Sequence, residues 1–257
     1  MAEEATTRSM ALFCDFENVA LGVRDARYSA FDIRKVLERL LLKGNIVVKK
    51  AYCDWERYKE FKAGMHEAAF ELIEIPHVRP SGKNSADIRM VVDALDLCYT
   101  KSHVDTFVII SGDSDFSALV SKLRENNKLV IGVGVKKSTS DLLISNCDEF
   151  IFYDDLVREG AKQRRAKAKP PAGKVSPKKT AAESEEEKKQ EALDLVLETV
   201  EDLFEERGDE EKVWGSMVKQ ALKRRKPGFN ESYHGFRTFG KLLEEAQSRK
   251  MLTLKFD

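Results

Sequence analysis

Short runs of β-branched and aromatic residues alternate with amphipathic segments between residues 8 and 157, and this alternation constrains the fold more than any other feature. The apolar runs are mostly uninterrupted by polar residues, which is typical of strands covered on both faces of a sheet. The segments between them repeat apolar residues at helical spacing. The runs fall at residues 11–14, 46–48, 72–75, 107–110, 129–133 and 150–152, and the helical stripes at 33–41, 58–69, 88–98 and 116–123. This pattern predicts an α/β, three-layer domain with a mainly parallel sheet. Asp32 is expected to cap the first of these helices and Gly44 to end it.

Charge divides the chain into three parts, although its 44 basic and 44 acidic residues balance overall. Residues 158–182 carry nine basic residues and one acidic residue, with three prolines and almost no large apolar residue, whereas both flanks are slightly acidic. Such a segment buries too little surface to offset its ordering entropy. We therefore predict a folded unit at 1–157, a basic flexible linker at 158–185 and a second folded unit at 186–257.

The cysteines and the hydropathy indicate a cytoplasmic protein. The four cysteines (Cys14, Cys53, Cys98 and Cys147) are widely spaced within apolar runs, which favours buried free thiols over a zinc site or disulfides. No apolar run is long enough for a membrane span, and the first ten residues do not resemble a signal peptide. We expect no membrane partner.

Four aspartates fall where a parallel sheet forms its site. Asp15, Asp113 and Asp115 follow predicted strands, and Asp87 lies in the first turn of a predicted helix. Any one of them could simply cap a helix or complement its dipole. Gathered at one sheet edge, however, their carboxylates would repel one another unless a cation neutralised them. Mg²⁺ or Mn²⁺ suits such oxygen ligands, so we predict a divalent cation held by Asp15, Asp87, Asp113 and Asp115.

Carboxylates of this kind, without a nucleophilic Ser/His/Asp or Cys/His set, point to phosphoryl chemistry with water as the nucleophile. A glycine-rich phosphate loop is missing from the sequence. A metal-dependent phosphatase ranks low, because the Asp-x-Asp pair follows a late strand rather than the first. A non-catalytic RNA-binding or regulatory adaptor remains the alternative from another class.

The segments CDFEN, KNSADIRMVVDAL and VIISGDSDFSALVSKLRENNKLVIGVGV resemble the NYN domain of the LabA-like group, within the PIN-like nuclease superfamily. The resemblance covers about residues 9–155. It implies a PIN-like fold and RNA cleavage at Asp15, Asp87, Asp113 and Asp115 with Mg²⁺ or Mn²⁺. It also implies supporting polar roles for Asn18 and Ser111, and a contact of Lys83 with the scissile phosphate. Asp93 belongs to the same motif but lies on another helix face from Asp87, so we interpret it as structural or peripheral.

The second unit shows three apolar helical stripes, at 193–204, 214–222 and 236–246, followed by alternation at Leu252, Leu254 and Phe256 that predicts a strand. The run VWGSMVKQALKRRKPGFNESYHGFRTFGKLLEEAQ resembles the LOTUS (OST-HTH) domain, which implies a small winged-helix fold associated with RNA binding and protein contacts. Trp214, Phe236 and Phe239 are expected in the core.

One end of the second helix is basic and could bind nucleic acid beside Phe229 and Tyr233. The same charges could merely complement the helix dipole, and the two interpretations weigh equally. The basic residues are Lys219, Lys223, Arg224, Arg225 and Lys226.

Taken together, these features predict a metal-dependent ribonuclease, expected to be an endoribonuclease, acting on RNA that is expected to be single-stranded. The LOTUS domain would recognise RNA or a protein partner. An exposed apolar helix face could support a homodimer.

Overall fold

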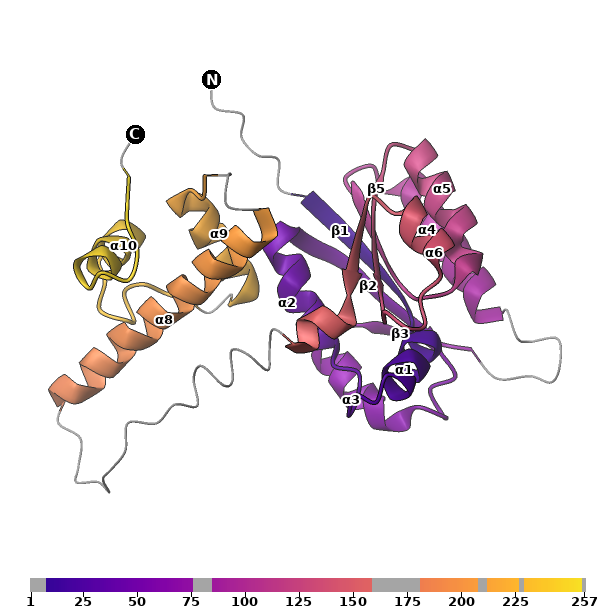
Figure 1. Cartoon of the computed structure of the whole chain (residues 1–257), viewed down its shortest axis with the longest axis horizontal. Helices are drawn as coiled ribbons and strands as arrows, with labels where there is room; N and C mark the ends of the chain where they lie inside the picture. The colour runs from indigo at the N-terminus through magenta and orange to yellow at the C-terminus, as the bar shows by residue number, and fades with distance from the viewer. Residues whose placement is uncertain (1–7, 76–84, 159–180, 208–211, 227–228, 256–257) are drawn as a thin grey trace. The chain divides into compact units, whose positions relative to one another are not determined.

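Six strands form one sheet in the computed structural model, which describes residues 8–75, 85–158, 181–207, 212–226 and 229–255 (Figure 1). The chain divides into two compact units, the first carrying the sheet and the second carrying three helices. The strands are β1 (Arg8–Asp15), β2 (Gly44–Cys53), β3 (Glu71–Glu74), β4 (Thr106–Ile110), β5 (Leu129–Gly134) and β6 (Glu149–Phe152). Their order is β3-β2-β1-β4-β5-β6, and every neighbouring pair is parallel. The predicted α/β class and parallel sheet are therefore confirmed.

Helices cover both faces of the sheet, which explains the continuous apolar runs (Figure 1). On one face, α1, α2 and α3 pack on alternate residues of β1 such as Leu12. On the other face, α4, α5 and α6 pack on the intervening residues such as Phe13. The bounds are α1 (Phe16–Asp25), α2 (Ile33–Lys43), α3 (Lys59–Glu67), α4 (Ser85–Thr100), α5 (Ser117–Glu125) and α6 (Asp141–Asn146), with a short 3₁₀ helix η1 (Ser114–Phe116) before α5.

The predicted helix signals at Asp32 and Gly44 are confirmed. The Asp32 side chain accepts a hydrogen bond from the backbone N–H of Arg34 at the start of α2. Gly44 follows the last residue of α2 and begins β2. Helix α1 was not predicted, because it begins directly after β1 without a polar spacer.

The cysteines are all free; Cys14, Cys53 and Cys98 are buried, whereas Cys147 is half-buried. Within the described ranges, no helix combines the length and hydropathy that crossing a bilayer requires.

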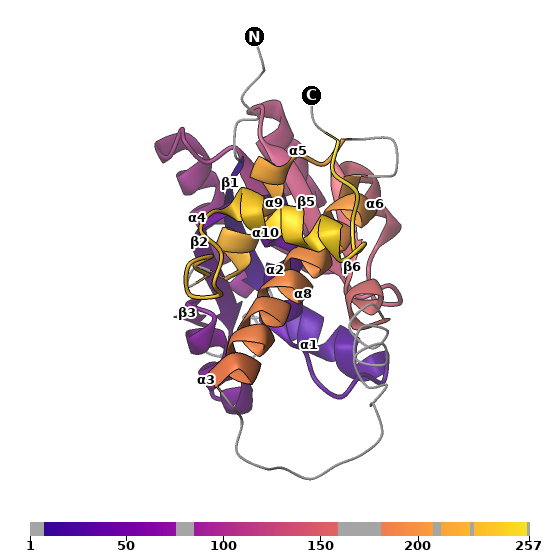
Figure 2. The same ribbon diagram turned by 90° about the vertical axis from the view of Figure 1, so that its left-hand side faces the viewer.

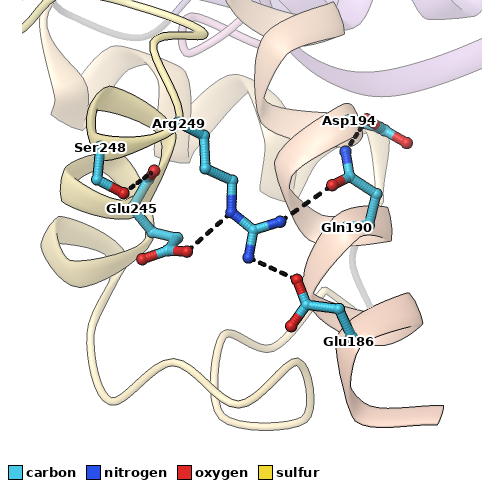
Figure 3. Close-up of polar contacts among 6 residues, drawn as sticks. All are labelled: Glu186, Gln190, Asp194, Glu245, Ser248 and Arg249. Atoms are coloured by element: carbon cyan, nitrogen blue, oxygen red, sulfur yellow. Dashed lines mark hydrogen bonds and ion pairs between the residues drawn. The ribbon is translucent and has the colours of Figure 1, made fainter. Parts of the chain in front are cut away.

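The second unit consists of α8 (Ala181–Arg207), α9 (Gly215–Arg225) and α10 (Phe239–Ser248) (Figure 2). Its core contains Val196 of α8, Leu222 of α9 and Leu242 of α10, as the helical stripes predicted. A salt-bridge cluster also joins α8 to α10 (Figure 3). There Arg249 donates to Glu245 at 2.8 Å, Gln190 at 3.2 Å and Glu186 at 2.6 Å.

Two expectations for this unit are wrong. Residues 252–255 are not in a strand, and Phe256 lies outside the described residues. The alternation there reflects partial packing of Leu252 and Leu254 on the helical core. Trp214, the N-cap residue of α9, is 48% exposed, whereas Phe236 and Phe239 are buried as predicted.

Residues 159–180 of the predicted basic linker lie outside the described part of the chain, whereas its last five residues, 181–185, form the start of α8 instead of a flexible segment.

Candidate active site

The direction of strand order reverses between β1 and β4, the two central strands of the sheet. In open parallel sheets, the crevice at the carboxyl ends of such strands is where ligands bind. Asp15 is the last residue of β1, and Ser111 follows the last residue of β4. Topology therefore brings the CDFEN and SGDSDF segments to the same place.

Asp15 is buried, with 7% of its surface exposed, and two groups hold its carboxylate. Ser111 Oγ donates to Asp15 Oδ2 at 3.0 Å, and the backbone N–H of Asn18 donates to Asp15 Oδ1 at 3.4 Å. The second bond caps α1. Capping and placement at the site are thus compatible roles for this aspartate.

Two carboxylates at this edge, those of Asp15 and Asp87, have raised pKa values. The pKa of Asp15 is raised to about 7, mainly by burial and next by the charge of Asp87, although the hydrogen bonds from Ser111 and Asn18 oppose the shift. The pKa of Asp87 is raised to about 6, mainly by burial and next by the charges of Asp113 and Asp115. Burial and nearby negative charges disfavour the ionised form of a carboxyl group. The first turn of α4 therefore lies within electrostatic range of the β1 and β4 ends.

Asp113 and Asp115 occupy the turn after β4. Asp113 Oδ1 accepts a hydrogen bond from the backbone N–H of Asp115 at 3.0 Å and so caps η1. The N–H of Asp113 in turn donates to Ser111 Oγ at 3.2 Å. Asp113, rather than Asp115, is therefore the capping residue, and Asp115 is exposed.

Asn18 joins the two strand ends through its side chain, because its Oδ1 accepts a hydrogen bond from the N–H of Gly112 at 2.8 Å. Asn18 and Ser111 thus form a chain of hydrogen bonds linking Asp15 to the Gly112–Asp113 turn. Lys83 lies outside the described residues.

The donor set suits a hard divalent cation by its chemistry, because the carboxylates of Asp15 and Asp87 are both destabilised by burial and by negative neighbours. The described side chains are not, however, arranged as a complete metal-coordination site. Across the part of the chain that the structure describes, no three His, Cys, Asp or Glu side chains converge closely enough to hold an ion.

Glu17 belongs to the same electrostatic group but was missed by sequence reasoning. Its charge contributes to raising the pKa of Asp87. Its Oε1 also lies 3.3 Å from Arg57 Nη1, which partly neutralises it. The sequence feature that could have identified Glu17 is its position two residues after Asp15, inside the DFEN segment.

Asp93 has a structural role, as its separate helix face predicted. Its Oδ2 accepts a hydrogen bond from the buried Tyr52 hydroxyl at 2.9 Å and from Lys50 Nζ at 3.4 Å. Its Oδ1 accepts one from Arg89 Nε at 3.0 Å. These bonds to Tyr52 and Lys50 tie α4 to β2, and these partners lower the pKa of Asp93 despite its partial burial.

Among the described residues, some basic side chains of α9 and its C-cap contact a carboxylate and others are exposed. Lys219 contacts Glu231 at 2.7 Å, and Arg225 contacts Asp202 at 2.6 Å. Arg224 is half-buried, and burial lowers its pKa. Lys223 and Lys226 are exposed. Of the two nearby aromatic residues, Phe229 is buried and Tyr233 is 64% exposed.

Comparison with known proteins places these motifs in a family. The chain is 24% identical over 150 residues to Meiosis regulator and mRNA stability factor 1 of Xenopus tropicalis, covering 58% of this chain and 9% of that protein. It is 24% identical over 159 residues to an uncharacterized protein of Methanocaldococcus jannaschii, covering 62% of this chain and 63% of that protein. The match thus spans less than two thirds of either curated relative.

A solved structure of a protein of unknown function from Vibrio parahaemolyticus is also similar, with a TM-score of 0.53 at 28% identity. The similarity covers 60% of this chain and 98% of that one. The NYN domain model matches residues 9–154, which is more than half of the sequence, and the chain therefore belongs to the NYN domain family.

Proposed function

We propose that this protein is a metal-dependent ribonuclease that hydrolyses RNA phosphodiester bonds at Asp15, Asp87, Asp113 and Asp115. The observation that carries the proposal is that the pKa values of Asp15 and Asp87 are both raised, by burial and by neighbouring aspartates, at the point where strand order reverses. Membership of the NYN family adds to it, since the PIN-like nucleases that this sequence resembles cut RNA at such a cluster. The name of the Xenopus relative, which refers to mRNA stability, favours RNA as the substrate.

We assign Mg²⁺ or Mn²⁺ to the four aspartates. When bound, either ion would polarise the phosphodiester and lower the pKa of the attacking water. The chain's own contribution is to hold the carboxylates. Ser111 orients Asp15, and Asn18 fixes the Gly112–Asp113 turn through the Gly112 N–H. Burial of Asp15 strengthens electrostatic interactions there relative to water.

We also assign the catalytic domain to the LabA-like group, and residues 186–257 to a LOTUS (OST-HTH) module that selects RNA or a protein partner. Three helices with an apolar core support that assignment. Lys223 and Lys226, at the end of α9, are exposed cations that could contact phosphate. We retain residues 1–157, 158–185 and 186–257 as the domains, with the linker adding salt-sensitive attraction to RNA.

Cleavage of a labelled single-stranded RNA, with Mn²⁺ or Mg²⁺ and with EDTA, tests the proposal. We expect wild-type protein to cleave only with metal, and Asp113→Asn to lose at least about a hundredfold in rate, because a group that acts in the transition state is removed. Asp96→Asn is the matched control, since Asp96 is an exposed aspartate near the other end of α4. Equal cleavage by wild type and Asp113→Asn would sink the proposal. RNA retention without product at every metal concentration would instead identify an adaptor.

A further inference from the structure

The loop between β5 and α6 packs closely against the turn that carries Asp113. Ser140 N, at the end of the loop, donates to Gly112 O at 2.9 Å, and Ser111 N, at the start of the turn, donates to Val133 O of β5 at 3.0 Å. The loop therefore lies at the carboxyl edge of the sheet, beside the aspartates.

Three glycines make this close approach possible. A Cβ on Gly112 would lie 2.5 Å from the backbone oxygen of Ser138, closer than real Cβ atoms approach other atoms. A Cβ on Gly22 would collide with the Ser138 hydroxyl, and one on Gly134 with the Thr139 hydroxyl. These glycines come from α1, the β4 turn and β5, so three separate elements leave room for the same two loop residues.

The loop presents Lys136 and Lys137 immediately before those two residues, and both lysines are exposed. Lys136 Nζ lies 5.5 Å from the centre of the Phe152 ring, and its backbone N–H donates to Asp154 Oδ2 at 2.8 Å. Neither ammonium group forms an ion pair with a carboxylate of the described residues. By contrast, Lys59, Lys62 and Lys122 on α3 and α5 are each paired with a glutamate.

We propose that the loop from Val135 to Ser140 binds the sugar-phosphate backbone of RNA beside the aspartate site, with Lys136 and Lys137 as its phosphate contacts. The inference rests on the proposed function for the identity of the ligand. A carboxylate cluster repels the phosphates that flank a scissile bond, so a polyanionic substrate needs fixed cations next to it. The packed loop supplies them at a defined place, without reading the base sequence.

The test is the binding of the full-length protein to a fluorescein-labelled single-stranded RNA in EDTA, which prevents metal-dependent cleavage, over a range of salt concentrations. Each lost phosphate contact lowers the salt dependence of single-strand binding by about 0.7 in log–log slope. We expect Lys136→Ala/Lys137→Ala to lower that slope by about 1.4. Lys136→Arg/Lys137→Arg should restore it.

The matched control is Lys101→Ala/Lys122→Ala, which removes the same charge at the opposite edge of the sheet, where α4 and α5 end. An unchanged slope in the loop variant, or a loss equal to that of the control pair, would overturn the proposal. So would an absence of salt-dependent RNA binding by the wild type. Melting temperatures identical to wild type would show that the variants are folded.

The experiments distinguish a failure of the RNA-binding role of the loop from a failure of the nuclease assignment. If wild type binds RNA through Lys136 and Lys137 but never cleaves it, the loop is supported and the nuclease assignment is wrong. If wild type cleaves RNA and the loop variant keeps its salt slope and KM, the loop assignment is wrong.

Discussion

Ser111 Oγ donates a hydrogen bond to Asp15 Oδ2 across 3.0 Å, joining the ends of the two central strands in a buried setting. The bond holds a carboxylate whose pKa is raised to about 7 by burial and by Asp87. Asp15 is therefore poised between its neutral and charged forms near neutral pH, and Ser111 favours the charged form that a cation requires.

Replacing Ser111 by alanine should raise the pKa of Asp15 further, because a hydrogen bond to the charged form is lost. We expect RNA cleavage to fall about two- to fivefold at pH 7 and to recover toward the wild-type rate above pH 8. Steady-state rates across this pH range measure the shift. Ser117→Ala is the control, since its buried hydroxyl has no hydrogen-bond partner among the described residues. A uniform loss at every pH would contradict the assigned role of Ser111.

The metal-free protein should become less stable as pH rises from 5 to 8. The folded-state pKa values of Asp15 and Asp87 lie above their ordinary value of 3.8, so the folded protein holds protons that the unfolded chain has released. This stabilisation is complete below the unfolded pKa and is lost as pH rises through about 6 to 7. Thermal unfolding in EDTA should show the decline, and Asp15→Asn should flatten it.

Added Mn²⁺ should reverse that decline. A cation that binds the ionised carboxylates stabilises the folded state by mass action, and protons compete with it. We expect the melting temperature to rise with Mn²⁺ at pH 8 and to change little at pH 5. A rise of equal size in Asp15→Asn would show that the ion binds elsewhere.

Tyr52→Phe should destabilise the first unit by about 1–3 kcal/mol, because a buried hydrogen bond to the charged Asp93 is removed. Urea unfolding can be followed through Trp55 in a Trp214→Phe background, which leaves a single tryptophan, in the first unit. Tyr99→Phe is the control, because Tyr99 is 64% exposed, and its effect should stay within about 0.5 kcal/mol. Equal stability of the two variants would mean that the Tyr52–Asp93 bond contributes nothing net.

Gly112→Ala should displace the β5–α6 loop, since its Cβ would meet the backbone oxygen of Ser138 at 2.5 Å. We expect a loss of about 1–3 kcal/mol in stability, as for other overpacked sites, together with weaker RNA binding. Gly64→Ala is the control, because a Cβ at Gly64 would meet nothing within 4 Å. Unchanged stability and binding would show that the loop tolerates the added methyl group.

The α/β class and the parallel sheet could be predicted from local sequence patterns. Continuous apolar runs such as 107–110 can be buried only when both faces of the sheet are covered. Such runs can be recognised directly in the local sequence. Asp32 and Gly44 likewise act through neighbouring backbone groups, so their caps could be predicted. The separate role of Asp93 followed from helical geometry alone.

The assembly of the site, in contrast, depends on contacts between segments far apart in the chain. Which strands are adjacent, and hence that Ser111 bonds to Asp15 and Asn18 to Gly112, depends on strand order rather than on local pattern. The exposure of Trp214 and the missing strand at 252–255 had the same origin, because local periodicity does not report what a side chain packs against. Burial and proximity of charges are properties of the folded chain, and they, rather than the presence of aspartates, raise the pKa values of Asp15 and Asp87.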